Sequence, residues 1–249
     1  MLESPAPSTD RARGDMADEG AGWGRREVGL LVGGMVALTV GLLAVGFALT
    51  RWAVLEPVRQ WDEDVAQWWV GVRTPMLDSL TDVGSGFSDT LVAIAVTAVA
   101  FFVLRAATGR WTLSWIVLAA IGGELLYFLA LTSGVGRERP DVPQLDAAPP
   151  TSGYPSGHTG AAVALYVCLA VIMWRRVSQR LLAVPVAVVL CLVPVVVGLS
   201  RMYRGMHFAT DVLFGALGGL LWLLVVLAVL WPQRRPQTGR ASDQEEEAL

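Results

Sequence analysis

Residues 211–231 read DVLFGALGGLLWLLVVLAVLW, an apolar run whose only charged side chain is Asp211, at its first position. A helix rises 1.5 Å per residue, so a run of this length crosses the ~30 Å hydrocarbon core of a bilayer. Backbone groups in lipid have to pair internally, and the run lacks the polar–apolar alternation of a barrel strand. The segment therefore predicts a membrane-spanning helix.

Five further apolar segments precede this one along the chain. Their predicted limits are 28–50, 88–107, 111–132, 157–174 and 181–200. The chain of 249 residues is 54% hydrophobic and only 16% charged, a composition that would be unusual for a soluble domain. The sequence therefore predicts an all-α fold, a polytopic membrane helix bundle with six transmembrane helices.

Polar tails flank the predicted bundle. Residues 1–27 are rich in Pro, Ser, Asp, Gly and Arg, and residues 232–249 end in an acidic stretch. These compositions predict two disordered cytoplasmic tails around one six-span domain, residues 28–231. The formal net charge of −3 gives no reason to expect a nucleic-acid partner.

Arginine placement predicts the orientation, since cytoplasmic loops carry an excess of basic residues. All 19 basic residues are arginines. A cytoplasmic N-terminus places twelve of them inside: Arg11, Arg13, Arg25, Arg26, Arg105, Arg110, Arg175, Arg176, Arg180, Arg234, Arg235 and Arg240. The other seven fall outside: Arg51, Arg59, Arg73, Arg137, Arg139, Arg201 and Arg204. We therefore expect a multi-pass plasma-membrane protein with both termini in the cytoplasm.

The connection between the first two spans carries an amphipathic pattern. Trp61, Val65, Trp68 and Val72 follow helical spacing, with acidic residues between them. The pattern is typical of a helix that lies in the outer membrane interface. A packed loop of the same bundle explains it equally well.

The chain has only two histidines, and the first follows a turn. Residues 154–160 read YPSGHTG, include His158 and stand immediately before the fourth span. Pro, Ser and Gly favour a turn into a helix. The free N–H groups at a helix start, together with its dipole, suit a bound phosphate. The segment is thus a candidate phosphate cradle beside His158.

The second histidine lies in residues 200–211, SRMYRGMHFATD, which join the fifth and sixth spans. His207 and Asp211 are four apart at a helix start, so their side chains share one face. A carboxylate there can fix the tautomer of the imidazole and support a nucleophilic histidine. Arg201 offers a planar, permanently charged fork for phosphate oxygens.

A third polar cluster, GRERPD at residues 136–141, follows the third span. Its two arginines, Arg137 and Arg139, lie at a membrane edge. At such a position an arginine either anchors lipid headgroups or binds a phosphate that reacts.

In their order along the chain, the three clusters resemble the membrane-bound type 2 phosphatidic acid phosphatase family. The family pattern is Lys-x6-Arg-Pro, then Pro-Ser-Gly-His, then Ser-Arg-x5-His-x3-Asp. The second and third parts are complete here, and the first is present as Arg139-Pro140 with Thr132 in the lysine position. The resemblance covers roughly residues 55–231 and implies six spans with a site that faces away from the cytoplasm.

The resemblance also implies roles for individual residues. His207 attacks phosphorus and becomes phosphorylated, Asp211 orients His207, and His158 protonates the leaving alkoxide. Water then hydrolyses the phosphohistidine, and the reaction needs no metal and no cofactor. The residues expected to bind the phosphoryl oxygens are Arg139, Arg201, Ser156 and Gly157.

Thr132 leaves the expected phosphate pocket one positive charge short. Arg137 and Arg204 are the two nearby arginines able to replace the missing lysine. We favour Arg137 as a phosphate-binding residue, because it belongs to the same motif as the vacant position.

Glu124 lies within the third predicted span. An acid in a span is costly and is a candidate functional residue by default. A protonated acid that hydrogen-bonds a neighbouring span is an equally good explanation.

These patterns predict an integral membrane lipid phosphatase whose partners are membrane lipids and a lipid phosphate substrate. Candidate substrates are phosphatidic acid, phosphatidylglycerol phosphate and polyprenyl pyrophosphate. Two other functions stay open: a lipid phosphotransferase and, because of Thr132, a catalytically impaired lipid-phosphate-binding protein. The related vanadium haloperoxidases share the site motifs, but six spans argue against that function.

Overall fold

The computed structural model describes residues 24–231, and every regular element in that range is a helix. Residues 1–23 and 232–249 of the two predicted tails lie outside the described residues, and residues 25–27 of the first predicted tail form the start of helix α2. The helices are α2 (Arg25–Arg51), α3 (Glu56–Gly71), α4 (Pro75–Gly86), α5 (Thr90–Thr108), α6 (Trp111–Gly134), α7 (Gly157–Ala162), α8 (Cys168–Arg176), α9 (Arg180–Tyr203) and α10 (Ala209–Leu230). A short 3-10 turn, η2 (Ala53–Leu55), precedes α3, and a π-helical segment, η3 (Val163–Val167), joins α7 to α8.

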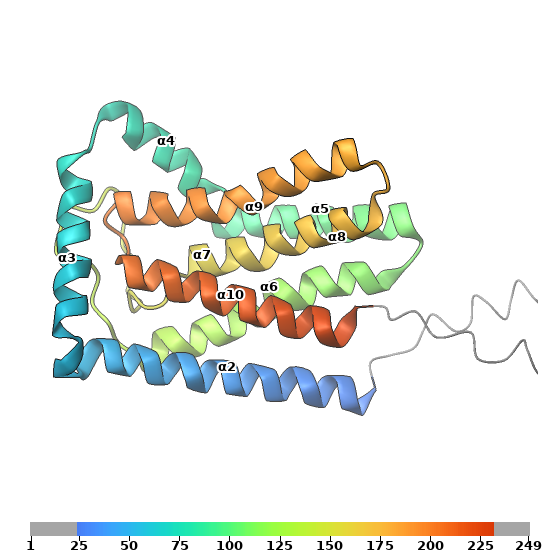
Figure 1. Ribbon diagram of the computed structural model, residues 1–249, viewed down its shortest axis with the longest axis horizontal. Coiled ribbons are helices and arrows are strands. Elements are labelled where there is room, and N and C mark those ends of the chain that lie inside the picture. Colours follow the sequence, from blue (N-terminus) through green and yellow to red (C-terminus); the bar gives the residue numbers. More distant parts are fainter. Residues whose placement is uncertain (1–23, 232–249) are drawn as a thin grey trace, which may run out of the picture.

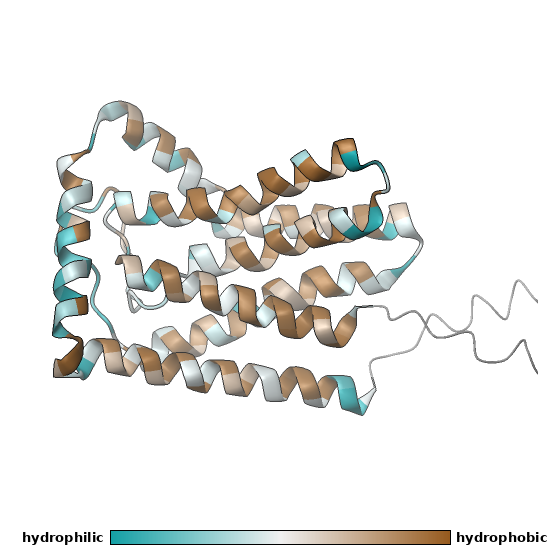
Figure 2. Cartoon of the chain, in the orientation of Figure 1, coloured by the Kyte–Doolittle hydropathy of each residue, from teal (hydrophilic) through white to brown (hydrophobic). Residues whose placement is uncertain are grey.

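Within residues 24–231, six helical segments are long and apolar enough to cross a membrane, which confirms the predicted six-span bundle. Five are single helices: α2, α5, α6, α9 and α10. The remaining one, residues 157–176, consists of α7, η3 and α8 in succession. The spans run along the long axis of the molecule (Figure 1). Apolar residues cover most of their length (Figure 2).

The connection between α2 and α5 is folded into two further helices. Helix α3 lies across one end of the bundle, opposite the end from which both described termini leave (Figure 1). We call this the site end. Trp61 and Trp68 on α3 are exposed, whereas Asp62 and Ala66 are buried. The predicted helix is therefore present, and it also packs against the bundle through its other face.

Helix α4 was not predicted from the sequence. It begins at a Thr74 cap, whose hydroxyl accepts a hydrogen bond from the Leu77 amide at 3.3 Å, followed by proline at the first helical position. Its twelve residues are too short and too polar for a span. It packs along α9 and leads into α5.

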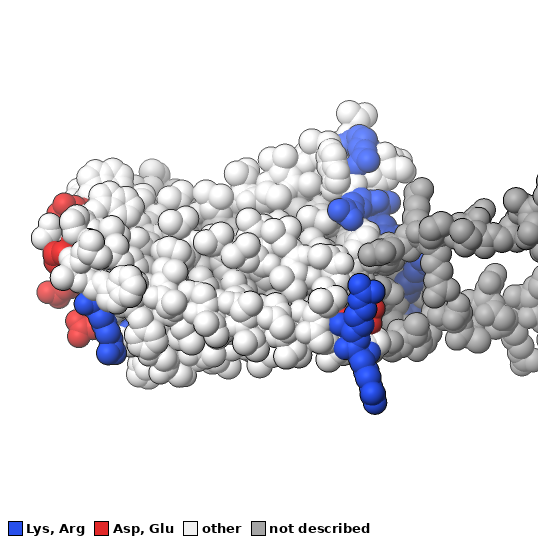
Figure 3. All heavy atoms as spheres, turned by 60° about the horizontal axis from the view of Figure 1, so that its bottom comes forward, with Lys and Arg blue, Asp and Glu red and all other residues white. Residues whose placement is uncertain are grey.

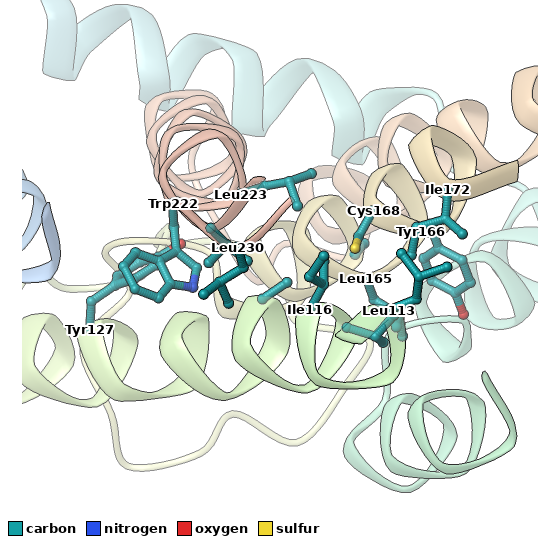
Figure 4. Close-up of a cluster of buried hydrophobic side chains, with 14 of the residues drawn as sticks. Leu113, Ile116, Tyr127, Leu165, Tyr166, Cys168, Ile172, Trp222, Leu223 and Leu230 are labelled. Atoms are coloured by element: carbon teal, nitrogen blue, oxygen red, sulfur yellow. The ribbon is translucent and has the colours of Figure 1, made fainter. Parts of the chain in front are cut away.

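The largest apolar core lies between α6, α8 and α10. Leu113, Ile116, Cys168 and Leu223 are among its buried side chains (Figure 4). Two glycines of α10 let this helix approach α7 closely. A Cβ atom on Gly219 would lie 2.6 Å from the Gly160 carbonyl oxygen, and one on Gly215 would meet the Ser156 carbonyl oxygen. This contact brings the start of α10 beside the start of α7.

Charged side chains are unevenly distributed between the two ends. On the face in Figure 3, arginines gather at the end where α2 begins, and the acidic side chains lie mostly at the site end. The helix ends and connections at the former end include Arg105, Arg110, Arg175 and Arg176. The arrangement matches the arginine bias read from the sequence.

Candidate active site

A cavity of about 980 Å³ opens at the site end and continues between α5 and α6. Its polar lining includes Arg139, His158, Arg201 and His207. Its remaining walls are largely apolar and include Ile94, Phe101, Phe102, Leu118, Leu125 and Phe128. Both histidines and two of the arginines that the sequence marked for chemistry therefore share one cavity with a wall suited to a lipid chain.

His207 lies in the turn between α9 and α10, with 5% of its surface exposed. Its Nδ1 atom is 2.7 Å from the Gly153 carbonyl oxygen. A carbonyl oxygen only accepts, so Nδ1 carries the proton and the neutral ring keeps its lone pair on Nε2. Nε2 is 3.4 Å from an Arg139 nitrogen that lines the same cavity. The atom available for attack therefore faces the cationic part of the cavity.

The surroundings of His207 favour its neutral form. Burial lowers the pKa of His207 well below its ordinary value, and the charges of Arg201 and Arg139 lower it further. The Gly153 carbonyl acts in the opposite direction without reversing this shift. A neutral imidazole is the form that a nucleophile needs.

Asp211 lies behind His207 in the first turn of α10 and is fully buried. Its Oδ2 atom accepts a hydrogen bond from the Phe208 amide at 2.9 Å and is 4.0 Å from His207 Nδ1. The nearest acceptor of the Nδ1 proton is thus the Gly153 carbonyl, and Asp211 acts on the turn that carries His207. A backbone carbonyl leaves no residue-type signal, so the sequence pattern gave no indication of Gly153.

Arg137 is buried on the far side of Asp211. It donates to Asp211 Oδ1 at 2.6 Å and to Asp62 Oδ2 at 2.7 Å, and its guanidinium lies over the Phe208 ring. It does not contribute to the lining of the cavity. This corrects the expectation that Arg137 replaces the missing lysine, because its charge is already paired with two carboxylates.

Asp62 is a functional candidate that the sequence analysis missed. This carboxylate of α3 is fully buried and accepts hydrogen bonds from the Thr210 amide at 3.0 Å and the Thr210 hydroxyl at 2.5 Å, besides Arg137. Asp62 and Ala66 are four apart on the face of α3 turned away from Trp61 and Trp68. That spacing is the only signal in the sequence that points to it.

Arg139 and Arg201 both line the cavity beside His207. Arg139 donates to the Met206 carbonyl at 2.7 Å, and Arg201 donates to the Ser85 hydroxyl and to Asp146 Oδ2, both at 2.9 Å. The Nε atom of each arginine is buried and has no hydrogen-bond partner among the described residues. The residues themselves line the cavity, so their positive charge can attract an anion there.

His158, the second residue of α7, also lines the cavity. Its Nε2 atom is 3.3 Å from Asp89 Oδ1, and its carbonyl accepts a hydrogen bond from the Ser88 hydroxyl at 2.7 Å. Asp89 directly precedes α5, so the α4–α5 connection supports His158. No pattern in the sequence indicates a role for that connection.

Of the two remaining predicted residues, Gly157 faces the cavity and Ser156 does not. Gly157 begins α7 and lines the cavity. Ser156 is fully buried, and its hydroxyl pairs with the Thr159 hydroxyl at 3.0 Å instead of facing the cavity. Its amide donates to the Asp211 carbonyl at 2.9 Å. Ser156 therefore ties the two histidine motifs together.

Comparison with known proteins identifies the family of this chain. The sequence model of the PAP2 superfamily matches residues 112–235. The chain belongs to the PAP2 superfamily. Phosphatidylglycerophosphatase B of Bacillus subtilis (strain 168) is 28% identical over 178 residues, which are 68% of this chain and 83% of the relative.

Two solved structures share the PAP2 fold seen here. A transmembrane PAP2-type phosphatidylglycerolphosphate phosphatase from Bacillus subtilis superposes with a TM-score of 0.69 and 24% identity, over 78% of this chain and 94% of that one. LpxE of Aquifex aeolicus superposes with a TM-score of 0.54 and 22% identity, over 66% of this chain and 93% of that one. This PAP2 chain therefore has the same fold as these two membrane proteins.

This PAP2 chain departs from its family pattern at Thr132, where the side chain only returns a hydrogen bond to the Leu129 carbonyl at 3.2 Å. Arg204, the second predicted substitute for the lysine, lies outside the main cavity. It binds Asp146 through two nitrogens and Asp82 at 3.1 Å. Among the described residues, neither Arg137 nor Arg204 takes the place of that cation.

Asp146 is the unexpected residue in this PAP2 cavity. It stands in the long loop before α7 and pairs with both Arg201 and Arg204. Burial alone would raise the pKa of Asp146, but the hydrogen bond and charge of Arg204, with the charge of Arg201, hold it below its ordinary value. The carboxylate therefore stays charged at neutral pH and partly neutralises Arg201.

Proposed function

We propose that this PAP2 protein is a lipid phosphatase that transfers the phosphoryl group of a lipid to His207 and then to water. The observation that carries the proposal is the position of His207 Nε2. The other ring nitrogen, Nδ1, donates a hydrogen bond to the Gly153 carbonyl. Nε2 therefore faces a cavity that combines Arg139 and Arg201 with apolar walls. This combination suits a substrate with an anionic head and a hydrocarbon tail.

The proposal assigns a residue to each step of the reaction. Nε2 of His207 forms a bond to phosphorus while the bond between phosphorus and the leaving oxygen breaks. His158 gives its proton to that oxygen. Arg139 and Arg201 donate to the equatorial oxygens, on which the transition-state charge is spread. In the second step water attacks phosphorus, His158 takes up a proton, and the bond to Nε2 breaks.

Asp211, Arg137 and Asp62 have a different task in this proposal. They touch no reacting atom and hold the turn that carries His207. Metal independence is part of the proposal, since two guanidinium groups and a histidine acid supply the electrostatic stabilisation. Activity is accordingly expected to survive a chelator.

We place the reaction at the outer face of the plasma membrane, with both termini in the cytoplasm. The arginine bias between the two ends supports this orientation. The name of the Bacillus relative makes phosphatidylglycerol phosphate one candidate substrate, beside phosphatidic acid and polyprenyl pyrophosphate.

The test uses the full chain purified in detergent and measures phosphate release from these three lipids. His207→Ala is expected to abolish both turnover and any acid-labile phosphoenzyme. His158→Ala is expected to slow the lipids more than an activated aryl phosphate, because a good leaving group needs little protonation. A phosphoenzyme that survives His207→Ala would refute the assignment of the nucleophile. If the lipid loses its phosphate but no inorganic phosphate is released, the protein is a phosphotransferase.

A further inference from the structure

One acid in the cavity takes no part in the proposed reaction. Glu124 of α6 lines the cavity and is only 4% exposed. Its carboxyl has no hydrogen bond or ion pair among residues 24–231. A buried polar group without a partner is costly and unusual in a protein, above all inside a membrane. The position is thus suited to a group that arrives with the ligand.

The packing of α6 against α7 fixes the distance of Glu124 from the reacting centre. A Cβ atom on Gly157, next to His158, would lie 2.6 Å from the Phe128 ring. One on Gly160 would lie 2.6 Å from Glu124 Oε1. Glu124 is four residues before Phe128, so it lies one helical turn, about 6 Å, further into the membrane. A lipid whose phosphate binds at the site end extends from its leaving oxygen into the membrane. Glu124 therefore stands on the leaving-group side of the phosphate site.

A second polar side chain of the cavity wall also lacks a hydrogen-bond partner. Thr97 of α5 is 8% exposed and lines the same cavity. Its hydroxyl has no hydrogen-bond partner among the described residues, although a helical threonine can usually bond the preceding turn. The Thr97 hydroxyl is itself buried, so Glu124 is the polar group that this otherwise apolar wall offers to a ligand.

We infer that Glu124 forms a subsite for the uncharged, oxygen-bearing glycerol unit next to the scissile bond of a glycerolipid monophosphate. In such lipids the carbons beside the phosphoester carry hydroxyl or ester oxygens. A carboxyl group can donate to an ester carbonyl or accept from a hydroxyl. The inference rests on the proposed function and narrows its substrate class.

The same position disfavours a pyrophosphate lipid. When the terminal phosphate binds at Arg139 and Arg201, the second phosphate of a polyprenyl pyrophosphate lies on the leaving-group side. The side chains known to line that part of the cavity are apolar, apart from Thr97 and Glu124 itself. An anion buried beside a carboxyl without a cation is strongly disfavoured. Glu124 therefore selects glycerol phosphomonoesters.

The alternative is a structural role through Tyr127. Its hydroxyl is buried without a hydrogen-bond partner among the described residues, and it lies close to the same Gly160 position. If the Glu124 side chain rotated to form a hydrogen bond with the Tyr127 hydroxyl, its role would be in helix packing. Tyr127→Phe removes this possibility and leaves the carboxyl in place, so it separates the two roles.

The experiment compares kcat/KM on phosphatidic acid, a polyprenyl pyrophosphate and p-nitrophenyl phosphate, which carries no glycerol unit. Glu124→Leu is expected to lower kcat/KM on phosphatidic acid roughly three- to tenfold, the size of one neutral hydrogen bond, and to leave the aryl phosphate unchanged. Glu124→Gln, which still donates and accepts, should stay within about twofold of the wild type on phosphatidic acid. Glu63→Gln on α3 is the matched control, with all three values unchanged.

The possible outcomes separate this inference from the proposed function. Equal losses on all three substrates for Glu124→Leu, or the same selectivity change in Tyr127→Phe, would show a structural role and overturn the subsite. A wild type that prefers the pyrophosphate would also overturn it while leaving the phosphatase intact. Failure of the wild type to release phosphate from any of the three would overturn the proposed function itself.

Discussion

Two sets of polar side chains meet at His207, and they differ in what their charges face. Arg139, Arg201 and His158 line the cavity, where a ligand can reach them. On the other side, Asp62, Arg137 and Asp211 face only one another and neighbouring protein groups. We call the first set the cavity side and the second the buried network.

The comparison shows that neighbouring residues of one motif can belong to opposite sets. Arg137 and Arg139 are two apart in the chain, yet one pairs with two carboxylates and the other lines the cavity. Removal of a cavity-side residue is therefore expected to affect turnover. Removal of a network residue leaves buried charges without a partner, so it is expected to affect folding first.

The largest effect is expected for Arg137→Met. It leaves the carboxylates of Asp62 and Asp211 buried and unpaired, and breaking a buried pair in this way typically costs about 3–5 kcal/mol. Thermal unfolding in detergent should show a midpoint far below that of the wild type. Arg180→Met, which removes an exposed arginine at the other end of the bundle, is the control and should change the midpoint little.

A second variant sharpens this result. Asp62→Asn combined with Arg137→Met removes one of the two stranded charges, so the pair should be less destabilised than the sum of the single variants. Arg137→Met with a wild-type unfolding midpoint and lower kcat/KM would contradict the division. That result would return Arg137 to the phosphate pocket.

A smaller effect on stability and a specific effect on turnover are expected for Arg201→Ala. Loss of one charge-assisted hydrogen bond to the phosphoryl group costs about 1.5–3 kcal/mol, or roughly 10- to 150-fold in kcat/KM. Arg204→Ala is the matched control, because it also loses Asp146 as a partner but lies outside the cavity. Equal losses in both variants would mean that Arg201 acts only through Asp146.

The pH profile adds an independent readout for Arg201. Burial and the charges of Arg201 and Arg139 lower the pKa of His207, and the neutral ring is the nucleophile. The acid limb of kcat/KM should therefore lie below the ordinary histidine pKa of about 6.5. Removal of one cation makes protonation of His207 easier, so Arg201→Ala should move this limb to higher pH. An unmoved limb would contradict the assigned electrostatics.

The sequence was sufficient for the spans and for the cavity side of the site. A membrane helix needs only a long apolar run, which residues 211–231 display without reference to any other part of the chain. The histidine motifs stand at span ends, so the topology alone brings His158 and His207 to the same end. Local patterns were enough because both features depend on local composition and order.

The buried network could not be predicted, because it depends on pairing over long separations. Asp62 binds Arg137 and Thr210, which are 75 and 148 residues away. The Gly153 carbonyl, which holds His207, is a backbone group that any residue could supply. Helix α4 was missed because it is short and only weakly apolar. Arg137 was therefore placed with the phosphate ligands, since its motif gave no sign of two buried acids.

The smallest effect is expected where the cavity side departs from its family pattern. Thr132 is one helical turn beyond Phe128, which lines the cavity, so a longer side chain on this face of α6 points to the cavity mouth. Because Arg137 and Arg204 are already paired with acids, a cation restored at this position would add to Arg139 and Arg201. Thr132→Lys should therefore raise kcat/KM.

The expected gain is modest because the position is partly exposed and water screens the new charge. Such contacts are worth about 0.3–1 kcal/mol, or roughly two- to fivefold, and the gain should shrink at high salt. Ser133→Lys is the matched control, since it adds the same charge one residue further, on another face of α6. If Ser133→Lys raises kcat/KM as much, the gain is general attraction of an anionic lipid to a cationic surface. If neither variant has an effect, Arg139 and Arg201 already supply the charge that the phosphate needs, and the missing lysine has no cost to the cavity side.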